Sequence, residues 1–410
     1  MTTTKNNEHK KLNFSSEREQ SQACLNSAEH EKNQGRKVLN VPNLRFPEFQ
    51  GEWEETKIGD IAIVVGGGTP DTNTSQYWNG KIQWFTPSEI GRNKYVYNSV
   101  RTISEDGLNK SSAKLLPIGT ILLSSRATVG ECSINKKECT TNQGFQSLIP
   151  KENISNEFVY YLIQTKRKDL IRKSCGSTFL EISANEVRKI VVSIPTIKEQ
   201  DKIAKLLSLL DERIATQNKI IDKLQSLIKG ISSRIFASIQ GIEYRMGDIV
   251  TITNGNSNVQ DAVTQSKDGL YPFFDRSEDI KYLPTFLFDK EAIIYPGEGT
   301  EFMPRYFKGK FALHQRCYAI FDFNEIINAR FLYFYLKTRN SYFVKNAVGS
   351  TVPSLRLDTF QKLKVIIPPK KTQHSVSSFL SSMEQKRNVE KKILYKLLNQ
   401  KQYLLRQMLI

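Results

Sequence analysis

One long amphipathic stretch decides the fold. Residues 196–236 read TIKEQDKIAKLLSLLDERIATQNKIIDKLQSLIKGISSRIF. The pattern Thr196-x-x-Glu199 is typical of a helix start, in which a hydroxyl and a carboxylate cap free backbone N–H groups. Beyond it, apolar residues recur at alternating spacings of four and three, which predicts a coiled-coil seam. The seam comprises Ile203, Leu207, Leu210, Ile214, Gln217, Ile221, Leu224 and Ile228, and continues through Ile231 and Ile235.

A second stretch with this spacing ends the chain, and its seam comprises Val376, Leu380, Met383, Glu390, Leu394, Leu397 and Leu404. It is too polar to be stable alone, because isolated helices depend on packing. We therefore expect the two helices to pair as an intramolecular antiparallel coiled coil. Gln217 and Glu390, near the middle of the seams, would fix the register at a cost in stability. The alternative is two helices that each lie on their own domain.

The chain contains an internal repeat. Gly176-Ser177-Thr178 recurs as Gly349-Ser350-Thr351, an offset of 349 − 176 = 173 residues. The same offset relates residues 158–161 to 331–334 and Ile194-Pro195 to Ile367-Pro368. Because these matches keep their order, the chain holds two related halves. The period is far longer than that of a solenoid repeat, which is about 20–50 residues.

Each half begins with a mixed segment. Short β-branched or aromatic runs, broken by Gly, Pro, Asn and Ser, predict strands, while residues 158–172 and 330–345 predict helices. The expected fold class is therefore α+β, with two similar mixed domains separated by the two long helices. We expect a disordered polar tail (1–40), a first domain (41–195), a central helix (196–238), a second domain (239–369) and a C-terminal helix (370–410).

Charge and composition narrow the class of partner. The chain has 410 residues, of which 59 are Lys or Arg and 42 are Asp or Glu, so its net charge is +17. Such an excess indicates a polyanionic partner, although a basic surface that only keeps the protein soluble is the alternative. The longest aliphatic run, residues 61–65, is too short for a membrane span. The N-terminus is polar where a signal peptide needs an apolar core, so we do not expect export. The five scattered cysteines predict neither disulfides nor a metal site, and we expect a cytoplasmic protein.

Taken together, these features resemble the DNA specificity subunit of a type I restriction–modification system. The matching motifs are Phe46-Pro47-x-Phe49-x-Gly51-x-Trp53, Ile58-Gly59-Asp60, Gly68-Thr69-Pro70, Gly176-Ser177-Thr178 and Ile194-Pro195 through Gln200-x-x-Ile203. The resemblance covers roughly residues 41–410.

The resemblance implies a subunit without catalytic residues or a bound cofactor. The two mixed domains would be target-recognition domains, each reading one half of a bipartite asymmetric site in double-stranded DNA. The helices would set the spacer and dock two methyltransferase subunits, and restriction/translocase subunits would complete the complex. Adenine methylation and restriction would then use S-adenosylmethionine, ATP and Mg on those partners.

Three pairs of loops, equivalent in the repeat, are candidates for DNA contact. The first loop is 66–69 in one half and 254–258 in the other, the second is 124–128 and 296–300, and the third is 142–143 and 314–316. Arginine can pair with guanine, glutamate with the cytosine amine, and amides with adenine. The candidate residues are Gly68, Thr69, Ser125, Arg126, Asn142, Gln143, Asn254, Asn256, Asn258, Glu298, His314, Gln315 and Arg316. Ordinary turns between strands, or amides that satisfy a loop backbone, would give the same pattern.

Further basic and aromatic residues are candidates for phosphate contact, because affinity for DNA comes mainly from cations at phosphates. They are Lys81, Trp84, Arg92 and Lys94 in the first half, and Arg276, Lys281, Arg305 and Lys308 in the second.

Two other functions remain to be weighed. A stand-alone DNA-modifying enzyme would need a catalytic motif, but Ile367-Pro368-Pro369-Lys370 lacks the amide and the aromatic residue of an amino-methyltransferase motif. A coiled-coil scaffold without nucleic acid would leave the charge of +17 and the duplicated domains unexplained.

Overall fold

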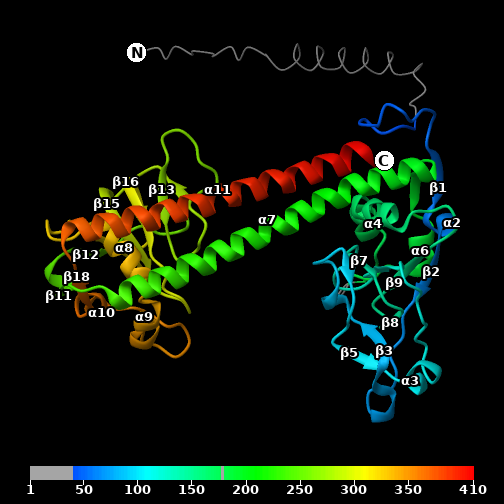
Figure 1. The fold of residues 1–410 in the computed structure, drawn as a ribbon, viewed down its shortest axis with the longest axis horizontal. Helices are drawn as coiled ribbons and strands as arrows, with labels where there is room; N and C mark the ends of the chain where they lie inside the picture. Colours follow the sequence, from blue (N-terminus) through cyan, green and yellow to red (C-terminus); the bar gives the residue numbers. More distant parts are fainter. Residues whose placement is uncertain (1–39, 177–179) are drawn as a thin grey trace, which may run out of the picture. The chain divides into compact units, whose positions relative to one another are not determined.

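The computed structural model describes residues 40–176 and 180–410 (Figure 1). The expected polar tail therefore lies outside the described residues, apart from Asn40. The chain divides into two compact units, of which unit 1 is Met1–Leu210 with Gln400–Ile410, and unit 2 is Asp211–Asn399.

Unit 1 is built on two small sheets. The first has the strand order β2 (Ala62–Gly66), β9 (Gln146–Pro150), β6 (Ile121–Leu123), β7 (Cys132–Asn135) and β4 (Tyr95–Val96), and the second has the order β5 (Arg101–Ile103), β3 (Trp78–Phe85) and β8 (Cys139–Thr141). Helix α4 (Asn156–Thr165) packs on this core, and its residues 158–163 are all buried. The shorter helices are α2 (Ile58–Ile61), α3 (Glu105–Asn109), α5 (Arg167–Arg172) and α6 (Ala184–Arg188), with 3-10 turns η1 (Ser75–Tyr77) and η2 (Pro87–Glu89).

Unit 2 has one six-stranded sheet. Its order is β12 (Thr251–Asn254), β17 (Cys317–Phe321), β15 (Phe288–Pro296), β16 (Arg305–Leu313), β13 (Tyr271–Phe274) and β14 (Lys281–Leu283). Helices α8 (Ala329–Lys337), α9 (Asn340–Asn346) and α10 (Leu357–Gln361) and the turn η3 (Met246–Asp248) complete the domain. Apart from the two-stranded ribbons that meet the long helices, unit 1 has two sheets where unit 2 has one. Residues 136–138 interrupt the strand between β7 and β8, whereas β16 runs unbroken through the equivalent position.

The duplication is visible where each domain meets its long helix. In unit 1, β1 (Glu54–Lys57) pairs antiparallel with β10 (Val191–Ile194), and in unit 2 β11 (Ile242–Arg245) pairs in the same way with β18 (Lys364–Ile367). Buried Gln200 accepts a hydrogen bond from the Ser155 backbone N at 3.0 Å and donates to Pro195 O at 2.9 Å. Gln373 repeats both bonds, with Asn328 N at 2.7 Å and Pro368 O at 2.9 Å. The recurring glutamine thus fastens each long helix to its own domain.

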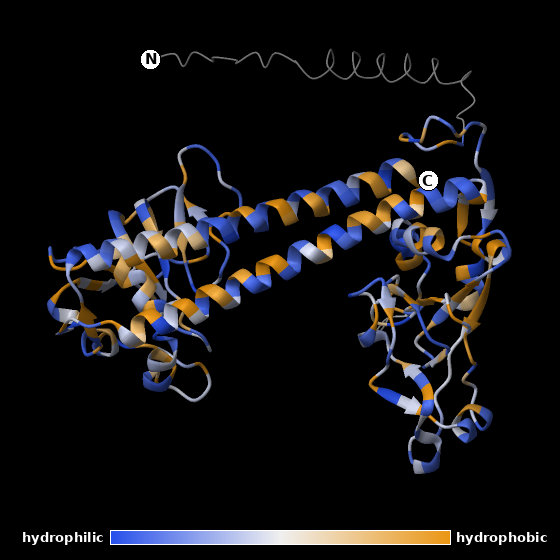
Figure 2. Cartoon of the chain, in the orientation of Figure 1, coloured by the Kyte–Doolittle hydropathy of each residue, from blue (hydrophilic) through white to orange (hydrophobic). Residues whose placement is uncertain are grey.

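The long helices are α7 (Ile197–Ser238) and α11 (Lys370–Met408). Apolar residues recur along both between hydrophilic ones (Figure 2). All the seam residues expected from the sequence are buried or half-buried. No helix of the described ranges is apolar enough over a sufficient length to cross a membrane.

The two helices contact each other within each unit. In unit 2, Gln217 Nε2 donates to Glu390 Oε2 at 2.6 Å and to Glu390 O at 3.1 Å. Ile231 lies in the same apolar cluster as Val376. Residue numbers rise along α7 as they fall along α11, so the contacts in this unit are antiparallel. In unit 1, the cluster joins residues 203–207 of α7 to residues 404–410 at the end of the chain.

The start of α7 differs from the expected capping box. The Glu199 carboxylate, which is buried, accepts two hydrogen bonds from the Arg45 guanidinium, each at 2.8 Å, instead of turning back to the Thr196 backbone. The expectation failed because Arg45 is 154 residues away in the chain, and its guanidinium matches a carboxylate with two parallel bonds.

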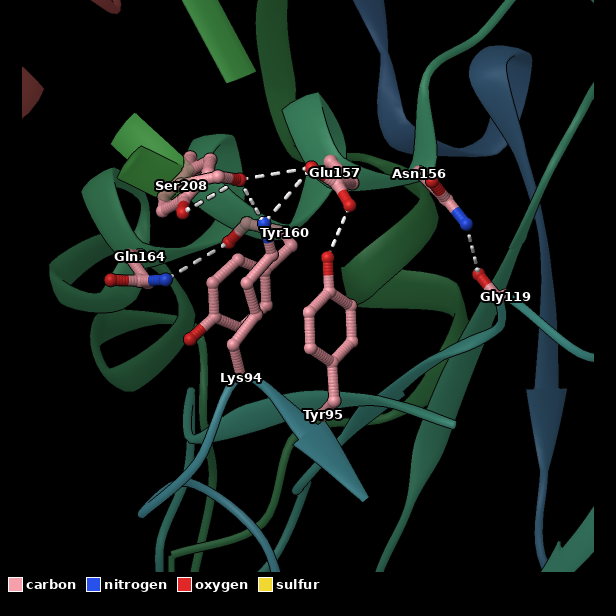
Figure 3. Close-up of polar contacts among 9 residues, drawn as sticks. Lys94, Tyr95, Gly119, Asn156, Glu157, Tyr160, Gln164 and Ser208 are labelled. Atoms are coloured by element: carbon pink, nitrogen blue, oxygen red, sulfur yellow. Dashed lines mark hydrogen bonds and ion pairs between the residues drawn. The ribbon is translucent and has the colours of Figure 1, made fainter. Parts of the chain in front are cut away.

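A half-buried polar cluster joins α4 to α7 in unit 1 (Figure 3). The Glu157 carboxylate accepts hydrogen bonds from Lys94 Nζ at 3.0 Å, from Ser208 Oγ at 2.9 Å and from the Tyr95 hydroxyl. The Lys94 ammonium also lies 4.8 Å from the centre of the Tyr161 ring. Burial alone would raise the pKa of Glu157, but the hydrogen bonds from Tyr95, Lys94 and Ser208 outweigh it and lower this pKa below its ordinary value.

A Glu157→Gln variant should weaken this attachment in a pH-dependent way. Because the pKa of Glu157 is lowered in the folded state, its stabilisation is present above the ordinary value of about 4.3 and is lost as the pH falls through the lowered pKa. We expect the variant to lower the free energy of local unfolding by about 1–3 kcal/mol at pH 7 and by much less at pH 3. Hydrogen exchange of the α4 amides measures this difference.

Glu186→Gln is the matched control, because the Glu186 carboxylate forms a surface ion pair with Lys189, at 2.8 Å, one turn away at the end of the same short helix. Its effect should be below about 0.5 kcal/mol. A Glu157→Gln effect of equal size at both pH values would contradict the assignment.

Candidate nucleic-acid interface

In unit 1 the three loops expected to contact DNA come together. The first loop meets the third through Gly68 N, which donates to Thr141 O at 2.8 Å, and through the Thr69 hydroxyl, which donates to Gln143 Oε1. The second loop meets the third through Ser125 N, which donates to Gly144 O at 2.8 Å. Segments about 75 residues apart in the chain therefore form one surface. The first and second loops follow β2 and β6, and the third loop leads into β9, which pairs with both of these strands.

A glycine allows this close approach. A Cβ atom on Gly67 would lie 1.9 Å from Asn142 O and 2.4 Å from Thr141 Oγ1, far inside van der Waals contact. The equivalent residue of unit 2 is Gly255, where a Cβ atom would lie 1.9 Å from Leu313 O. Both units thus require a glycine where the first loop crosses the third.

The second loop of unit 1 presents an arginine in an ion pair. Arg126 donates to Glu181 Oε2 through Nε at 3.0 Å and through its terminal nitrogen at 2.7 Å. Both side chains are exposed at the surface. Glu181 belongs to the segment that contains the repeated Gly176-Ser177-Thr178, of which Ser177 and Thr178 lie outside the described residues.

The equivalent loops of unit 2 also converge. Asn254 Nδ2 donates to Gln315 O at 3.3 Å, Gln315 N donates to Ser257 O at 3.2 Å, and Ser257 N donates to Leu313 O at 3.1 Å. These bonds join the first loop to the third. The exposed side chains of Asn254, Asn256 and Asn258 lie on the joined surface.

A cavity of about 300 Å³ opens beside these loops. It is lined by Val259, Asp275, Arg276, Glu298, His314, Gln315, Arg316 and Cys317. At this cavity Arg316 donates to Glu298 Oε1 at 2.6 Å, which joins the third loop to the second. His314 Nδ1 accepts from the Arg316 backbone N at 3.2 Å. Burial lowers the pKa of His314, so its ring is neutral at pH 7 and holds the backbone of the arginine rather than adding a charge.

Several candidate residues are buried or bonded inside unit 1, which leaves them poorly placed to contact DNA. Gly68, Trp84 and Ser125 are buried, and Trp84 Nε1 donates to Gly68 O at 2.9 Å. Lys94 is held by Glu157 and Ser208 inside unit 1. Residue type alone does not show whether a side chain will be enclosed, and the burial of these groups argues against the role in DNA contact expected for them.

Arg305 and Lys281 bind residues of a loop in unit 2 rather than pointing into solvent. Arg305 donates to Ser277 O at 2.8 Å and to Asp275 O, and burial lowers its pKa. Lys281 Nζ lies 2.6 Å from Asp275 Oδ2. Both cations therefore fix residues 275–281, which carry exposed Arg276 to the edge of the cavity.

The other candidates remain accessible. Exposed or half-buried side chains belong to Thr69, Lys81, Arg92, Arg126, Asn142 and Gln143 in unit 1, and to Asn254, Asn256, Asn258, Arg276, Glu298, Lys308, His314, Gln315 and Arg316 in unit 2. Within the described part of the chain no group of three or more His, Cys, Asp or Glu side chains could hold a metal ion.

One element of the surface was missed from the sequence. The hairpin at residues 348–354 pairs Val348 with Ser354 through two backbone hydrogen bonds of 2.8 Å. It touches the second loop, because Gly299 N donates to Pro353 O at 3.0 Å and Leu355 N donates to Gly297 O at 2.8 Å. The signal was present, since this hairpin carries the Gly349-Ser350-Thr351 that recurs in the repeat.

Comparison with known proteins agrees with this organisation. The family model for the type I restriction modification DNA specificity domain matches the chain twice, at residues 50–226 and 242–399. The specificity subunit of the type I restriction enzyme MjaIX of Methanocaldococcus jannaschii is 29% identical over 380 residues, which cover 82% of this chain and 87% of that one. The EcoR124I/EcoR124II specificity subunit of Escherichia coli is 31% identical over 175 residues, covering 41% of this chain and 43% of that one.

Solved structures share the fold. The S subunit of a type I restriction–modification system from M. genitalium superimposes with a TM-score of 0.59 at 18% identity, over 90% of this chain and 99% of that one. Since the family model covers most of the sequence, once in each half, this chain belongs to the type I restriction–modification DNA specificity family.

Proposed function

We propose that the chain reads a bipartite DNA site for a type I restriction–modification complex and leaves catalysis to partner subunits. The observation that carries the proposal is the repeated surface: in each unit the same three loops converge around a required glycine, Gly67 or Gly255, and an Arg–Glu pair. The net charge of +17 supports a polyanionic ligand. Each recognition domain, 41–195 or 239–369, then reads one half-site in double-stranded DNA. A cytoplasmic location is part of the same proposal, because a subunit that binds DNA must have access to it.

The exposed loop residues contact the bases. Exposed cations contact the phosphates, and they include Lys81, Arg92, Arg276 and Lys308. Phosphate contacts set affinity and salt dependence, while side chains at base edges set specificity.

The long helices serve as spacer and docking platform in this proposal. Large apolar side chains that α7 and α11 leave exposed support docking of two methyltransferase subunits, and they include Leu209, Leu227, Phe379, Tyr395 and Tyr403. S-adenosylmethionine is bound by those subunits, and ATP and Mg by the restriction/translocase subunits of the full complex. The target base is adenine.

Replacing residues 41–195 with the corresponding domain of another family member tests the modular reading. We expect a hybrid subunit, assembled with its methyltransferase, to methylate a site in which one half is new and the other is unchanged. Methylome sequencing of cells that carry the hybrid measures both halves at once. The reciprocal replacement of residues 239–369 should change the other half only.

Changes in both halves from one replacement would refute modular reading. Methyl transfer by the purified chain alone would refute the division of labour, and absence of salt-sensitive DNA binding by the assembled complex would refute the proposed function itself.

A further inference from the structure

The cavity of unit 2 is bordered by a pair of opposite charges with unused hydrogen-bonding atoms. Arg316 donates one bond, at 2.6 Å, to Glu298 Oε1. Among the residues that the structure describes, Glu298 Oε2 accepts no hydrogen bond, and the remaining guanidinium N–H groups of Arg316 find no acceptor. The Arg316 side chain is 63% exposed, while that of Glu298 is 17% exposed. The pair therefore presents an acceptor and several donors side by side.

This pair is badly suited to a phosphate. Any phosphate drawn to Arg316 would also approach the Glu298 carboxylate, which repels it. The neutral ring of His314 adds no compensating charge. Exposed cations that form no ion pair within the described part of the chain, such as Lys308, suit phosphates better. The Glu298 carboxylate therefore favours a ligand that presents a hydrogen-bond donor next to hydrogen-bond acceptors.

One base pair offers that edge in the major groove. Guanine presents the acceptors N7 and O6, and its partner cytosine presents the N4 amine as a donor beside them. Free N–H groups of Arg316 match the guanine acceptors, and Glu298 Oε2 matches the cytosine amine. An A·T pair instead presents its single donor between two acceptors and adds a thymine methyl group.

We propose that Glu298 and Arg316 act as one specificity-determining unit that reads a single G·C pair in the half-site of unit 2. This inference rests on the proposed function and adds to it the residues and the base pair. The pair is held ready before DNA arrives, because His314 fixes the Arg316 backbone and the 348–354 hairpin fixes the backbone of the second loop.

Unit 1 carries the same chemistry with the partners exchanged. The repeat places Arg126 where unit 2 has Glu298, an offset of 298 − 126 = 172 residues. Arg126 pairs with Glu181, which comes from the segment equivalent to the hairpin of unit 2. The second loop therefore supplies one member of an Arg–Glu pair in both domains. The other member comes from the third loop in unit 2 and from the segment that contains Glu181 in unit 1.

The test uses the assembled complex of the full chain with its methyltransferase subunits. Methylome sequencing first gives the wild-type site, and duplexes that each change one base pair of this site are then titrated in equilibrium binding assays. Glu298→Gln and Arg316→Gln are compared with Glu243→Gln. Glu243 is the matched control because it also forms an exposed ion pair in unit 2, with Lys364 at 2.7 Å, in the β11–β18 sheet.

We expect wild-type complex to discriminate at one G·C position of one half-site by about tenfold to a hundredfold. Both cavity variants should reduce that ratio to within about threefold of unity, at the same position, and leave the other half-site unchanged. Glu243→Gln should match wild type. Unaltered discrimination, uniform weakening at all positions, or relaxation at different positions by the two variants would overturn the inference. A wild-type complex without bipartite preference would instead overturn the proposed function.

Discussion

A Gly67→Ala variant should lose recognition of one half-site. The added methyl group would lie 1.9 Å from Asn142 O and 2.5 Å from Thr141 O, and both atoms belong to backbone that cannot swing aside. The first loop must therefore move away from the third, which breaks the bond from Gly68 N to Thr141 O. Such overpacking costs about 1–3 kcal/mol and shifts backbone.

The expected effect on DNA binding is larger than the effect on stability. Each well-placed contact to a base is worth about 1–3 kcal/mol of discrimination, and the shift affects several contacts at once. We therefore expect affinity for the wild-type site to fall about a hundredfold or more, with the other half-site still read. Equilibrium binding of the complex with its methyltransferase subunits measures both effects.

The neighbouring glycine provides the control. A methyl group on Gly66 would meet only Gln146 Oε1, at 3.7 Å, which is an ordinary contact. Gly66→Ala should therefore bind within about twofold of wild type. In unit 2, Gly255→Ala should impair the opposite half-site, because its methyl group would lie 1.9 Å from Leu313 O. Equal affinities for Gly66→Ala and Gly67→Ala would show that the loop crossing has no part in recognition.

A heptad inserted into α7 alone should abolish methylation. The helix is anchored at both ends, by the cluster with residues 404–410 in unit 1 and by Phe236 against Phe331 in unit 2. Seven extra residues add about 10 Å of helix, so α7 could no longer satisfy both anchors and the bond from Gln217 to Glu390. We expect no methylation at the wild-type site, as measured by methylome sequencing.

Inserting a heptad into both helices lengthens the helix pair without changing how α7 and α11 are aligned. Duplicating residues 214–220 in α7 together with residues 387–393 in α11 adds a heptad to both helices of the pair, and it duplicates the Gln217–Glu390 contact itself. The subunit should then assemble, and the spacer should change by about three base pairs while both half-site sequences persist. Methylation of the unchanged wild-type site by the double insertion would disprove the spacer role of the helices.

The sequence predicted the long elements well. Alternating spacings of four and three identified the buried faces of α7 and α11, because residues at these spacings lie on the same side of a helix. The repeat predicted two related domains, and the recurring glutamine now has a reason: Gln200 and Gln373 make the same two backbone bonds. The sequence also identified the loops that converge in each unit, since equivalent loops of a duplicated domain follow equivalent strands.

Side-chain roles were predicted less well. Trp84 and Ser125 were expected at the DNA and are buried, while Glu199 was expected to cap its own helix and binds Arg45 instead. The division of unit 1 into two sheets also went unpredicted, because it depends on a three-residue interruption whose effect is decided by packing.

The sequence by itself determined the helices, the duplication and the three loops, because periodicity and repetition can be read directly from the order of residues. Only the tertiary structure decided which charged groups form ion pairs within the protein and which keep hydrogen-bonding atoms available for a ligand. Lys94 contacts Glu157, which is 63 residues away in the chain, and Arg126 contacts Glu181, which is 55 residues away. Arg316 and Glu298 pair at a cavity, where some of their hydrogen-bonding atoms remain unused. An ion pair forms between groups that folding brings within a few ångströms, and no local pattern in the chain encodes that distance.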